Sequence, residues 1–577
     1  MCHPAFYSHA IILAACIGSS AAASAQGTPN LLWATYYGGS SGDFGFDCAV
    51  DGSGNVYLSG STESFTTIAV GGHQNTHGGG ESDAFLVKFN ANGVRQWATY
   101  YGGTGHDTGG SCAVDDAGNV YLTGSTSSDS AIASGGFQNE YAGSSDAFLV
   151  KFDSNGVRLW ATYFGGPQAE GAFSCAVEAN GTVYLAGETR SASGIASSGY
   201  QNTYGGGVGD AFLVKFDSNG ARLWATYYGG AGNENHRSCA VDQAGNAYLV
   251  GRTDSDTAIA SGGHQNVFAG GALDGFLVKF DPNGAREWAT YYGGPGNDQG
   301  LSCAADAYGN VYLSGITNSV SGIFWDGHQG AFSGGEYDAF LVKFNSNGAR
   351  QWGTYYGGSG WDDGRSCAVD GAGSVYLAGD SDSGTNIAEN GYQNTLASPG
   401  VWDAFLVKFD PSGVRQWGTY YGEWASDLAW SCALDGNGHV FIAGETRSPS
   451  GMAVNGHQDT HGGGLFDAFL VKFDGEISVG TGHDSGSATD RDIVYIWPNP
   501  NQGDQLWVSL NGLPHPPEVS VLIQDLLGRP MYEAMRTLKS DGRSASPIQL
   551  NGHLPKGCYT VSVRTGTLLG TAGLIIQ

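Results

Sequence analysis

Short apolar segments alternate with glycine-rich turns along most of the chain, in a pattern that recurs about every 64 residues. Residues 83–103 show it clearly, because Asp-Ala-Phe-Leu-Val-Lys-Phe and Trp-Ala-Thr-Tyr-Tyr-Gly-Gly flank a short Asn/Gly turn there. Aromatic and β-branched residues on both sides of such a turn predict an antiparallel hairpin. The tryptophan of this hairpin recurs at Trp33, Trp97, Trp160, Trp224, Trp288, Trp352 and Trp417.

Each repeat contains four strand signals. In the first repeat they are residues 48–51, 56–60, 83–89 and the tryptophan strand that follows. The side chains on both faces of residues 83–89 are largely apolar, which suits a sheet packed between two neighbouring sheets. Short four-stranded units of this kind, repeated and stacked radially, predict a β-propeller.

The two ends of the repeat region predict how the ring closes. The region begins with a lone tryptophan strand at residues 31–37 and ends with an unpartnered strand at residues 467–473. We expect these two strands to pair, because pairing ties the ends together and removes an exposed sheet edge. The predicted fold is all-β: a seven-bladed propeller over residues 31–474, with one strand of the last blade from the N-terminal end.

The repeated motifs resemble those of the bacterial SBBP-type β-propeller repeat. They are Asp-Ala-Phe-Leu-Val-Lys-Phe-Asp-x-Asn-Gly, Trp-Ala-Thr-Tyr-Tyr-Gly-Gly and Asp-x-x-Gly-Asn-Val-Tyr-Leu-x-Gly. This resemblance implies a secreted propeller and assigns no activity.

The composition changes after the repeats. Residues 475–492 are rich in Gly, Ser, Thr and Asp and are interpreted as a linker. Residues 493–577 alternate strand and turn signals, which predicts a small β-sandwich. Three motifs in this region resemble the C-terminal sorting domain of type IX secretion in Bacteroidota, which implies recognition by that machinery and export. The residues that carry the resemblance are Pro498, Asn499, Pro500, Gly528, Arg529, Gly557 and Tyr559.

The N-terminus has features of an export signal. An apolar run begins at Ala10, and Ala23-Ser-Ala25 fits a small-x-small cleavage site. We therefore expect residues 1–25 to be a signal peptide. Leu13-Ala-Ala-Cys16 also resembles a bacterial lipobox, and the alternative is a lipid anchor at Cys16.

Charge and motif content exclude several classes of function. The formal net charge is −29, so the protein should repel nucleic acid and anionic lipid. The sequence contains no nucleophile motif, no His-Glu-x-x-His and no P-loop. We expect a monomeric propeller that binds no nucleic acid and needs no cofactor.

One cysteine occupies the same position in every repeat. Equivalent positions lie at equal separations around a ring, so a disulfide framework is not expected. We predict small buried side chains where the blades pack, with a thiolate metal ring as the alternative. These cysteines are Cys48, Cys112, Cys175, Cys239, Cys303, Cys367 and Cys432.

Strand order assigns the loops to two faces. The tight turns at residues 51–55 and 90–93 lie on one face, and the longer connections at 38–47 and 61–82 lie on the other, which we call the long-loop face. Binding residues are usually on loops held by a rigid scaffold. Five tryptophans on this face depart from the repeat and are candidates for stacking against sugar rings or a protein partner. They are Trp325, Trp361, Trp402, Trp424 and Trp430.

Acidic residues also recur on the long-loop face. Asp83 and Asp146 begin the third strand of their repeats, and Asp43 and Asp107 lie in the preceding loop. Paired carboxylates and glycine carbonyls suit calcium. Short Asp side chains also satisfy backbone N–H groups in turns, and we favour that structural use.

Histidine is interchangeable with other rings in these loops. Phe137 and Tyr200 replace His73 at one repeat position, which favours a packing role over metal binding or proton transfer. We expect His77 and His461 to be exposed loop residues.

Two functional classes and a structural one remain open. We favour a non-enzymatic binding or adhesion module for a polysaccharide or surface protein, because near-identical blades suit a scaffold. The alternatives are a secreted carbohydrate-active hydrolase or lyase that uses acidic residues on the long-loop face, and a structural matrix protein. Fold alone does not decide between them.

Overall fold

The computed structural model describes residues 28–475 and seven strands between residues 493 and 576. The chain divides into two compact units, Met1–Gly480 and Thr481–Gln577. The predicted signal peptide, nearly all of the predicted linker and part of the sorting motif lie outside the described residues. These include Cys16, Ala25, Pro498, Asn499, Pro500, Gly528 and Arg529.

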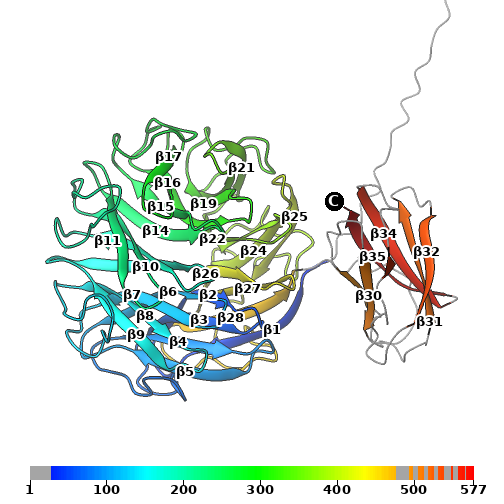
Figure 1. Cartoon of the computed structure of the whole chain (residues 1–577), viewed down its shortest axis with the longest axis horizontal. Coiled ribbons are helices and arrows are strands. Elements are labelled where there is room, and N and C mark those ends of the chain that lie inside the picture. Colours follow the sequence, from blue (N-terminus) through cyan, green and yellow to red (C-terminus); the bar gives the residue numbers. More distant parts are fainter. Residues whose placement is uncertain are drawn as a thin grey trace, which may run out of the picture. The chain divides into compact units, whose positions relative to one another are not determined.

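The first unit is a ring of seven four-stranded antiparallel sheets around a central axis (Figure 1), which confirms the predicted all-β, seven-bladed propeller. From the axis outward, the first complete blade comprises β2 (Asp43–Val50), β3 (Val56–Thr62), β4 (Asp83–Phe89) and β5 (Arg95–Tyr101). The second blade comprises β6 (Asp107–Val114), β7 (Val120–Thr126), β8 (Asp146–Phe152) and β9 (Arg158–Phe164), and the third comprises β10 (Glu170–Val177), β11 (Val183–Thr189), β12 (Asp210–Phe216) and β13 (Arg222–Tyr228). The fourth comprises β14 (Glu234–Val241), β15 (Ala247–Thr253), β16 (Asp274–Phe280) and β17 (Arg286–Tyr292), and the fifth comprises β18 (Asp298–Ala305), β19 (Val311–Thr317), β20 (Asp338–Phe344) and β21 (Arg350–Tyr356). The sixth comprises β22 (Asp362–Val369), β23 (Val375–Ser381), β24 (Asp403–Phe409) and β25 (Arg415–Tyr421).

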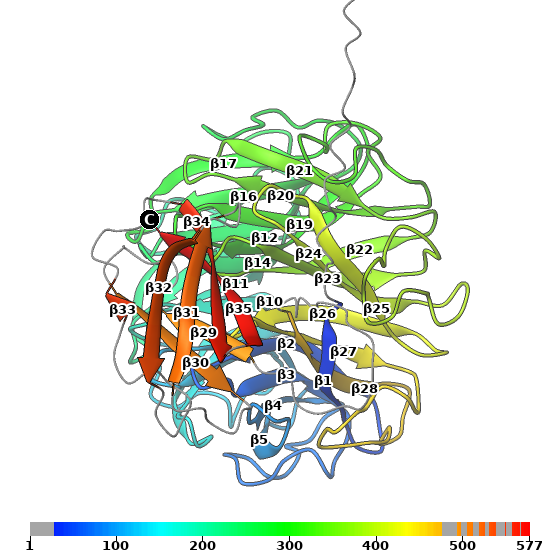
Figure 2. The same ribbon diagram turned by 90° about the vertical axis from the view of Figure 1, so that its right-hand side faces the viewer.

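The seventh blade joins the two ends of the ring. Its strands are β26 (Asp427–Leu434), β27 (His439–Thr446), β28 (Asp467–Asp474) and, outermost, β1 (Asn30–Tyr37). The β1–β28 register runs from Asn30 opposite Asp474 to Tyr37 opposite Ala468. Both views show β1 beside β28 (Figures 1 and 2). The predicted closure is therefore confirmed.

Every innermost strand contains a bulge. In β2 the register with β3 shifts between Gly45 and Asp47, which leaves Phe46 unpaired. A bulge turns one side chain out of the normal alternation, and it recurs at the same position in all seven blades. The bulge residues are Phe46, Gly110, Phe173, Arg237, Leu301, Arg365 and Trp430.

The repeat tryptophan couples each blade to the next. Trp160 Nε1 donates a hydrogen bond to the carbonyl of Ser218 at 3.0 Å, in a turn of the following blade. A Cβ at Gly220 in that turn would lie 2.9 Å from the Trp160 ring, and Gly220 has φ +82°. Glycine is therefore required both for the left-handed backbone and for the close approach. The same contact joins Trp33 with Gly93, Trp97 with Gly156, Trp224 with Gly284, Trp288 with Gly348, and Trp352 with Gly413.

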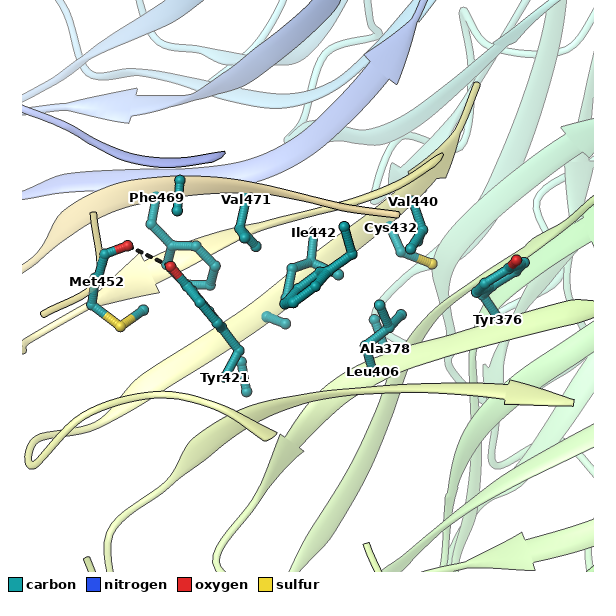
Figure 3. Packing of buried hydrophobic residues seen from close by; sticks show 14 of the residues in the cluster. Tyr376, Ala378, Leu406, Tyr421, Cys432, Val440, Ile442, Met452, Phe469 and Val471 are labelled. Carbon is teal, nitrogen blue, oxygen red and sulfur yellow. Dashed lines mark hydrogen bonds between the residues drawn. The ribbon is translucent and has the colours of Figure 1, made fainter. Parts of the chain in front are cut away.

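Apolar layers fill the spaces between blades. Figure 3 shows one junction, where Ala378 and Leu406 of one blade face Ile442 and Val471 of the next. Cys432 belongs to the same buried cluster. The cysteines of all seven blades are free and buried, as predicted. Strands with two apolar faces thus pack between neighbouring sheets.

The second unit contains two sheets, with strand orders β29-β30-β33 and β32-β31-β34-β35. Their packing as a sandwich stays a prediction. Gly557 and Tyr559 of the sorting motif lie on β34. Within the parts of the chain that the structure describes, no helix has the length and apolar character of a membrane span. The strands are β29 (Ile493–Trp497), β30 (Gln505–Asn511), β31 (Glu518–Asp525), β32 (Pro530–Thr537), β33 (Ile548–Gln549), β34 (Gly557–Thr565) and β35 (Thr567–Ile576).

The tryptophan–glycine contact yields a stability prediction. Gly220→Ala should lower the free energy of unfolding by about 1–3 kcal/mol, because the new methyl group meets the Trp160 ring in a strained backbone conformation. Gly52→Ala is the matched control, since a Cβ there meets no atom within 4 Å. Urea unfolding followed by tryptophan fluorescence measures both. Equal midpoints for the two variants would contradict the proposed role of the contact.

Candidate functional site

The seven blades differ most where their bulges line the axis. The bulge residue ranges from Gly110 to Trp430, whereas the cysteine two positions later is present in every blade. The bulge residues and the residues that follow them line a cavity of about 210 Å³ contributed by all seven innermost strands. Side chains that differ between blades are not needed for their common fold. The cavity follows the axis of the ring, and we call it the channel. Its end nearest the long-loop face, which we call the mouth, is therefore the candidate site.

Arg365 is the charged centre of the mouth. Its Nη2 lies 2.7 Å from Asp363 Oδ2 on the same strand, and its Nε donates to Asp380 on β23. Its Cζ lies 4.1 Å from the centroid of the Trp430 ring on β26, a cation–π contact. The Arg365 side chain is 20% exposed and that of Asp380 only 1%. The guanidinium is thus held on three sides at the edge of the solvent.

Aromatic side chains continue this group on one side. Trp361, just before β22, donates from Nε1 to Asp363 Oδ1 at 2.6 Å. The Trp361 ring packs against Tyr337, with centroids 5.1 Å apart, and against Trp402, with centroids 5.8 Å apart. Loops that precede β20, β22 and β24 therefore place three aromatic rings together.

A second aromatic run continues on the other side, across the ring closure. Trp430 meets Phe46 edge-on at 5.9 Å, and Phe46 stacks on Phe44 at 6.2 Å. Phe44 contacts Phe466 at 5.5 Å, and Arg447 Cζ lies 4.3 Å from the Phe466 ring centroid. We call this continuous set of contacts the mouth arc. It comprises Tyr337, Trp402, Trp361, Asp363, Arg365, Asp380, Trp430, Phe46, Phe44, Phe466 and Arg447.

Burial changes the proton affinity of the acids beside Arg365. Burial raises the pKa of Glu445 on β27 to about 7, although Arg365 opposes the rise. Burial also raises the pKa of Asp380, again against the effect of Arg365. Burial disfavours the Arg365 cation, but Asp380 and Asp363 more than compensate, so its pKa is raised. The arc therefore combines a permanent cation, hydrogen-bonding carboxyl groups and flat apolar rings.

On the other side of the cavity the bulge residues are Gly110, Phe173, Arg237 and Leu301, and hydrogen bonds between polar side chains join the same neighbouring blades. Asn235 on β14 donates to Glu188 at 2.7 Å. Arg252 donates to Asn235 at 3.2 Å and to Gln299 at 2.6 Å. This side thus has a single aromatic bulge residue, Phe173, in place of the continuous set of rings in the mouth arc.

The five tryptophans predicted as a site divide into two groups. Trp361, Trp402 and Trp430 lie in the mouth arc. Trp424 is 60% exposed in the connection between β25 and β26. Trp325 is 58% exposed and exchanges backbone hydrogen bonds with Gly353 on β21, the outermost strand of its blade. The structure therefore brings three of the five together and places Trp325 on the outer rim.

Sequence analysis missed the charged members of the arc. Arg365 occupies the same repeat position as Trp430, and Asp363 the same position as Phe44. A comparison of repeats for every residue type, and not for tryptophan alone, would have identified both. Their pairing with Asp380 depends on adjacent strands and has no signal in the local sequence.

The acidic candidates for calcium lie at blade junctions. Asp43, Asp83, Asp107 and Asp146 are the first residues of β2, β4, β6 and β8. A Cβ at Gly102 would lie 2.4 Å from Asp83 Oδ1 and 2.8 Å from Asp107 Oδ2, so the two carboxyl groups converge across a junction.

These carboxyl groups have structural partners. Asp83 Oδ2 accepts the Gly78 N–H at 2.7 Å, and Asp107 accepts hydrogen bonds from Thr126 and Ser128. The buried Oδ1 of Asp83 has no hydrogen-bond partner among the described residues. Within those residues, no group of three or more His, Cys, Asp or Glu side chains is arranged to hold a metal. The structural role we favoured is thus present, and calcium binding remains the untested alternative.

The expectation that His77 and His461 are exposed is wrong. Their side chains are 1% and 9% exposed. His77 accepts the Gly79 N–H at 3.1 Å and packs edge-on against Tyr100 at 5.6 Å. The reason is visible in the other repeats, where Tyr141 occupies this position as a packing ring.

The rings at the position of His73 do pack as predicted. His73 lies 6.2 Å from Phe152 of the next blade. Phe137, at the same repeat position, lies beneath the guanidinium of Arg222, with Cζ 4.3 Å from its ring centroid.

Two parts of the chain match known families. Residues 32–65 and 96–130 match the SBBP beta-propeller repeat. Residues 495–577 match the secretion system C-terminal sorting domain. The chain therefore carries SBBP propeller repeats and a type IX sorting domain, as its motifs predicted. The sorting domain indicates export to the cell surface or secretion.

The chain is also similar to parts of longer proteins. A WD repeat-containing protein of Acanthamoeba polyphaga mimivirus is 23% identical over 437 residues, which cover 61% of this chain and 30% of that protein. The regulatory protein FlaEY of Caulobacter vibrioides is 29% identical over 307 residues, which cover 49% of this chain and 31% of that protein. The chain thus spans less than a third of either relative.

Solved structures resemble it distantly. A fungal alcohol oxidase in complex with copper has a TM-score of 0.39 and 11% identity, over 95% of this chain and 99% of that one. A quinohemoprotein alcohol dehydrogenase from Pseudomonas putida has a TM-score of 0.33 and 10% identity, over 82% of this chain and 79% of that one. Neither likeness bears on the activity of this chain.

The buried junction acids predict an unusual dependence of stability on pH. Burial raises the pKa of Asp274 to about 7, above the value of about 3.9 in an unfolded chain. Between these values the folded state holds the proton more tightly, so the stability it contributes is present below about pH 4 and is lost as the pH rises to about 7. The melting temperature should therefore be higher at pH 5 than at pH 8.

Asp274→Asn should reduce this difference, because the amide resembles the protonated acid. Asp116→Asn, at an exposed position, is the control and should leave the difference unchanged. Melting curves at both pH values test this, and an equal or higher melting temperature at pH 8 would contradict it. Repeating the pH 8 melt with calcium and with EDTA tests the calcium hypothesis, since only a bound cation raises the melting temperature.

Proposed function

We propose that this exported propeller is a non-enzymatic binding or adhesion protein whose mouth arc holds a glycan. The support is the composition of the arc. Flat rings such as Trp361 and Trp402 suit the apolar faces of sugar rings, and fixed carboxyl and guanidinium groups suit their hydroxyls. The arc is confined to four neighbouring blades, so a ligand would be recognised by a part of the ring that is not repeated.

Charge pairing within the arc supports binding over catalysis. Arg365 is engaged by Asp363 and Asp380, and Asp363 also accepts the Trp361 indole N–H. Groups fixed in this way have defined directions, which favours selective hydrogen bonding. The largely structural alternative is less well supported, because a plain scaffold has no need for an arc that breaks the repeat.

One observation favours the hydrolase alternative. The pKa of Glu445 is raised to about 7 by burial, close to the value that suits a general acid near neutral pH. A second carboxyl group on the other side of a glycosidic bond would then be needed. Asp363 is the candidate, although its ion pair with Arg365 would hold it away from a substrate.

Retention on polysaccharides tests the proposal. The full-length protein should be retained by one or more members of a panel of soluble and insoluble polysaccharides, without loss of polymer on long incubation. Trp361→Ala should weaken retention by up to about tenfold, since an aromatic contact contributes about 0.5–1.5 kcal/mol. Trp325→Ala is the matched control, because it removes an exposed tryptophan from the rim and should leave retention unchanged.

The other outcomes are distinguishable. Release of oligosaccharides that is lost in Glu445→Gln would contradict a non-enzymatic function and support the hydrolase. No retention on any polymer would contradict glycan binding and leave a surface protein as the ligand to be sought.

A further inference from the structure

Six of the seven blade junctions contain the same arginine contact. The arginine lies near the start of the outermost strand and donates to carbonyl groups of the long loop in its own blade. Arg350, for example, donates to Gly322 at 3.1 Å and to Ile323 at 3.3 Å. The six residues are Arg95, Arg158, Arg222, Arg286, Arg350 and Arg415.

At Arg222 and Arg286 an aromatic ring of the preceding blade covers the guanidinium, and at Arg350 the covering ring is Trp325 of its own blade. Arg286 Cζ lies 4.5 Å from the centroid of Tyr200. A tyrosine of the preceding blade donates its hydroxyl to the same loop, as Tyr292 does to Ile323 at 2.7 Å. The fold thus builds a guanidinium site from loop carbonyls, a flat ring and a tyrosine.

The seventh junction has the same walls and no arginine. Leu31 pairs with Phe473 as Arg95 pairs with Phe89, so leucine stands at the arginine position. Tyr421 still donates its hydroxyl to the Met452 carbonyl (Figure 3). The missing side chain leaves a cavity of about 500 Å³, whose lining includes Leu31, Tyr392, Tyr421, Glu423, Gly451 and Met452.

Glu423 adds a negative charge at this junction. The other six blades have glycine at its position, for example Gly358. The Glu423 carboxyl lies against the long loop, since a Cβ at Gly451 would be 2.4 Å from its Oε1. None of the described residues that line the cavity is basic. The junction has therefore lost a cation and gained an anion.

We infer that this cavity binds a guanidinium group from outside the propeller, either a free guanidinium compound or the arginine side chain of a peptide. The chain encloses the same group at six equivalent places, and here it supplies the ring of Tyr392, the loop carbonyls and the carboxylate of Glu423. A carboxylate is the strongest partner of a guanidinium among protein side chains. The site is separate from the mouth arc and does not depend on the glycan proposal.

Calorimetric titration of the full-length protein tests this inference. The probes are arginine amide, the tripeptide Gly-Arg-Gly and their lysine counterparts. Both arginine probes should bind with one site per chain, and the lysine probes about tenfold more weakly, because ammonium lacks the planar fork. Tighter binding of the tripeptide identifies peptide arginine as the ligand, and tighter binding of the amide identifies a free compound.

Two variants restore the pattern of the other blades. Leu31→Arg fills the cavity with the chain's own guanidinium, so it should abolish probe binding and raise the melting temperature. Glu423→Gly should weaken binding about tenfold or more, and it needs no new side chain to be accommodated. The inference is overturned if wild type binds neither arginine probe, or if either folded variant binds them as wild type does.

A third variant is the matched control. Arg350→Leu removes the arginine at a junction that has Gly294 in place of Glu423. It should gain a second, weaker site for arginine amide and should melt at a lower temperature. A second site as strong as the first would overturn the role assigned to Glu423.

Discussion

The pairing of β1 with β28 is the constraint on which the propeller depends. The other six blades are continuous in sequence, and each can form its own hydrogen bonds, but the blades at the two ends of an open ring lack a neighbour on one face until the ring is closed. Strands with apolar side chains on both faces need a neighbour on each side. One missing pair of strands would expose two such faces and release the junction contacts of Trp33 and Leu31. Closure therefore makes seven local units into one cooperative structure.

The inner ring extends this dependence to the axis. The backbone N–H of each repeat cysteine donates a hydrogen bond to a side-chain oxygen of the preceding blade. At the junction with Cys112 the acceptor is Asp47. At the other six junctions it is a serine: Ser111, Ser174, Ser238, Ser302, Ser366 or Ser431. Asp47 also accepts hydrogen bonds from Ser111 and Ser431 on its two sides, both at 2.6 Å. In each blade the bulge turns the side chain of the residue before this serine or aspartate toward the axis. A strictly repeated ring of hydrogen bonds thus supports side chains that are free to differ, and the proposed binding site includes some of them.

Sequence alone predicted the blade number and the closure, because both follow from the spacing of one tryptophan. It also found Trp361, Trp402 and Trp430, which are large departures from an otherwise regular pattern. It missed Arg365 because an arginine is recognised as part of a site only when its partners are known. Its partner Asp380 lies on the next strand of the sheet. The same limit explains His77, whose burial depends on Tyr100 across a loop. The role of Leu31 was not predicted from the sequence. Leu31 replaces an arginine, and only the closed ring shows that it occupies the arginine position.

The position of β28 has a mechanical consequence. It is the last strand of the propeller, and Gly475 leads from it toward the C-terminal unit. Although it ends the ring in sequence, it lies inside its sheet, between β1 and β27. A load applied along the chain from the C-terminal side would have to shear two antiparallel ladders at once, because neither neighbour can be peeled away first. A surface protein held by that end would resist drag from flowing liquid better than one whose final strand lay at a sheet edge.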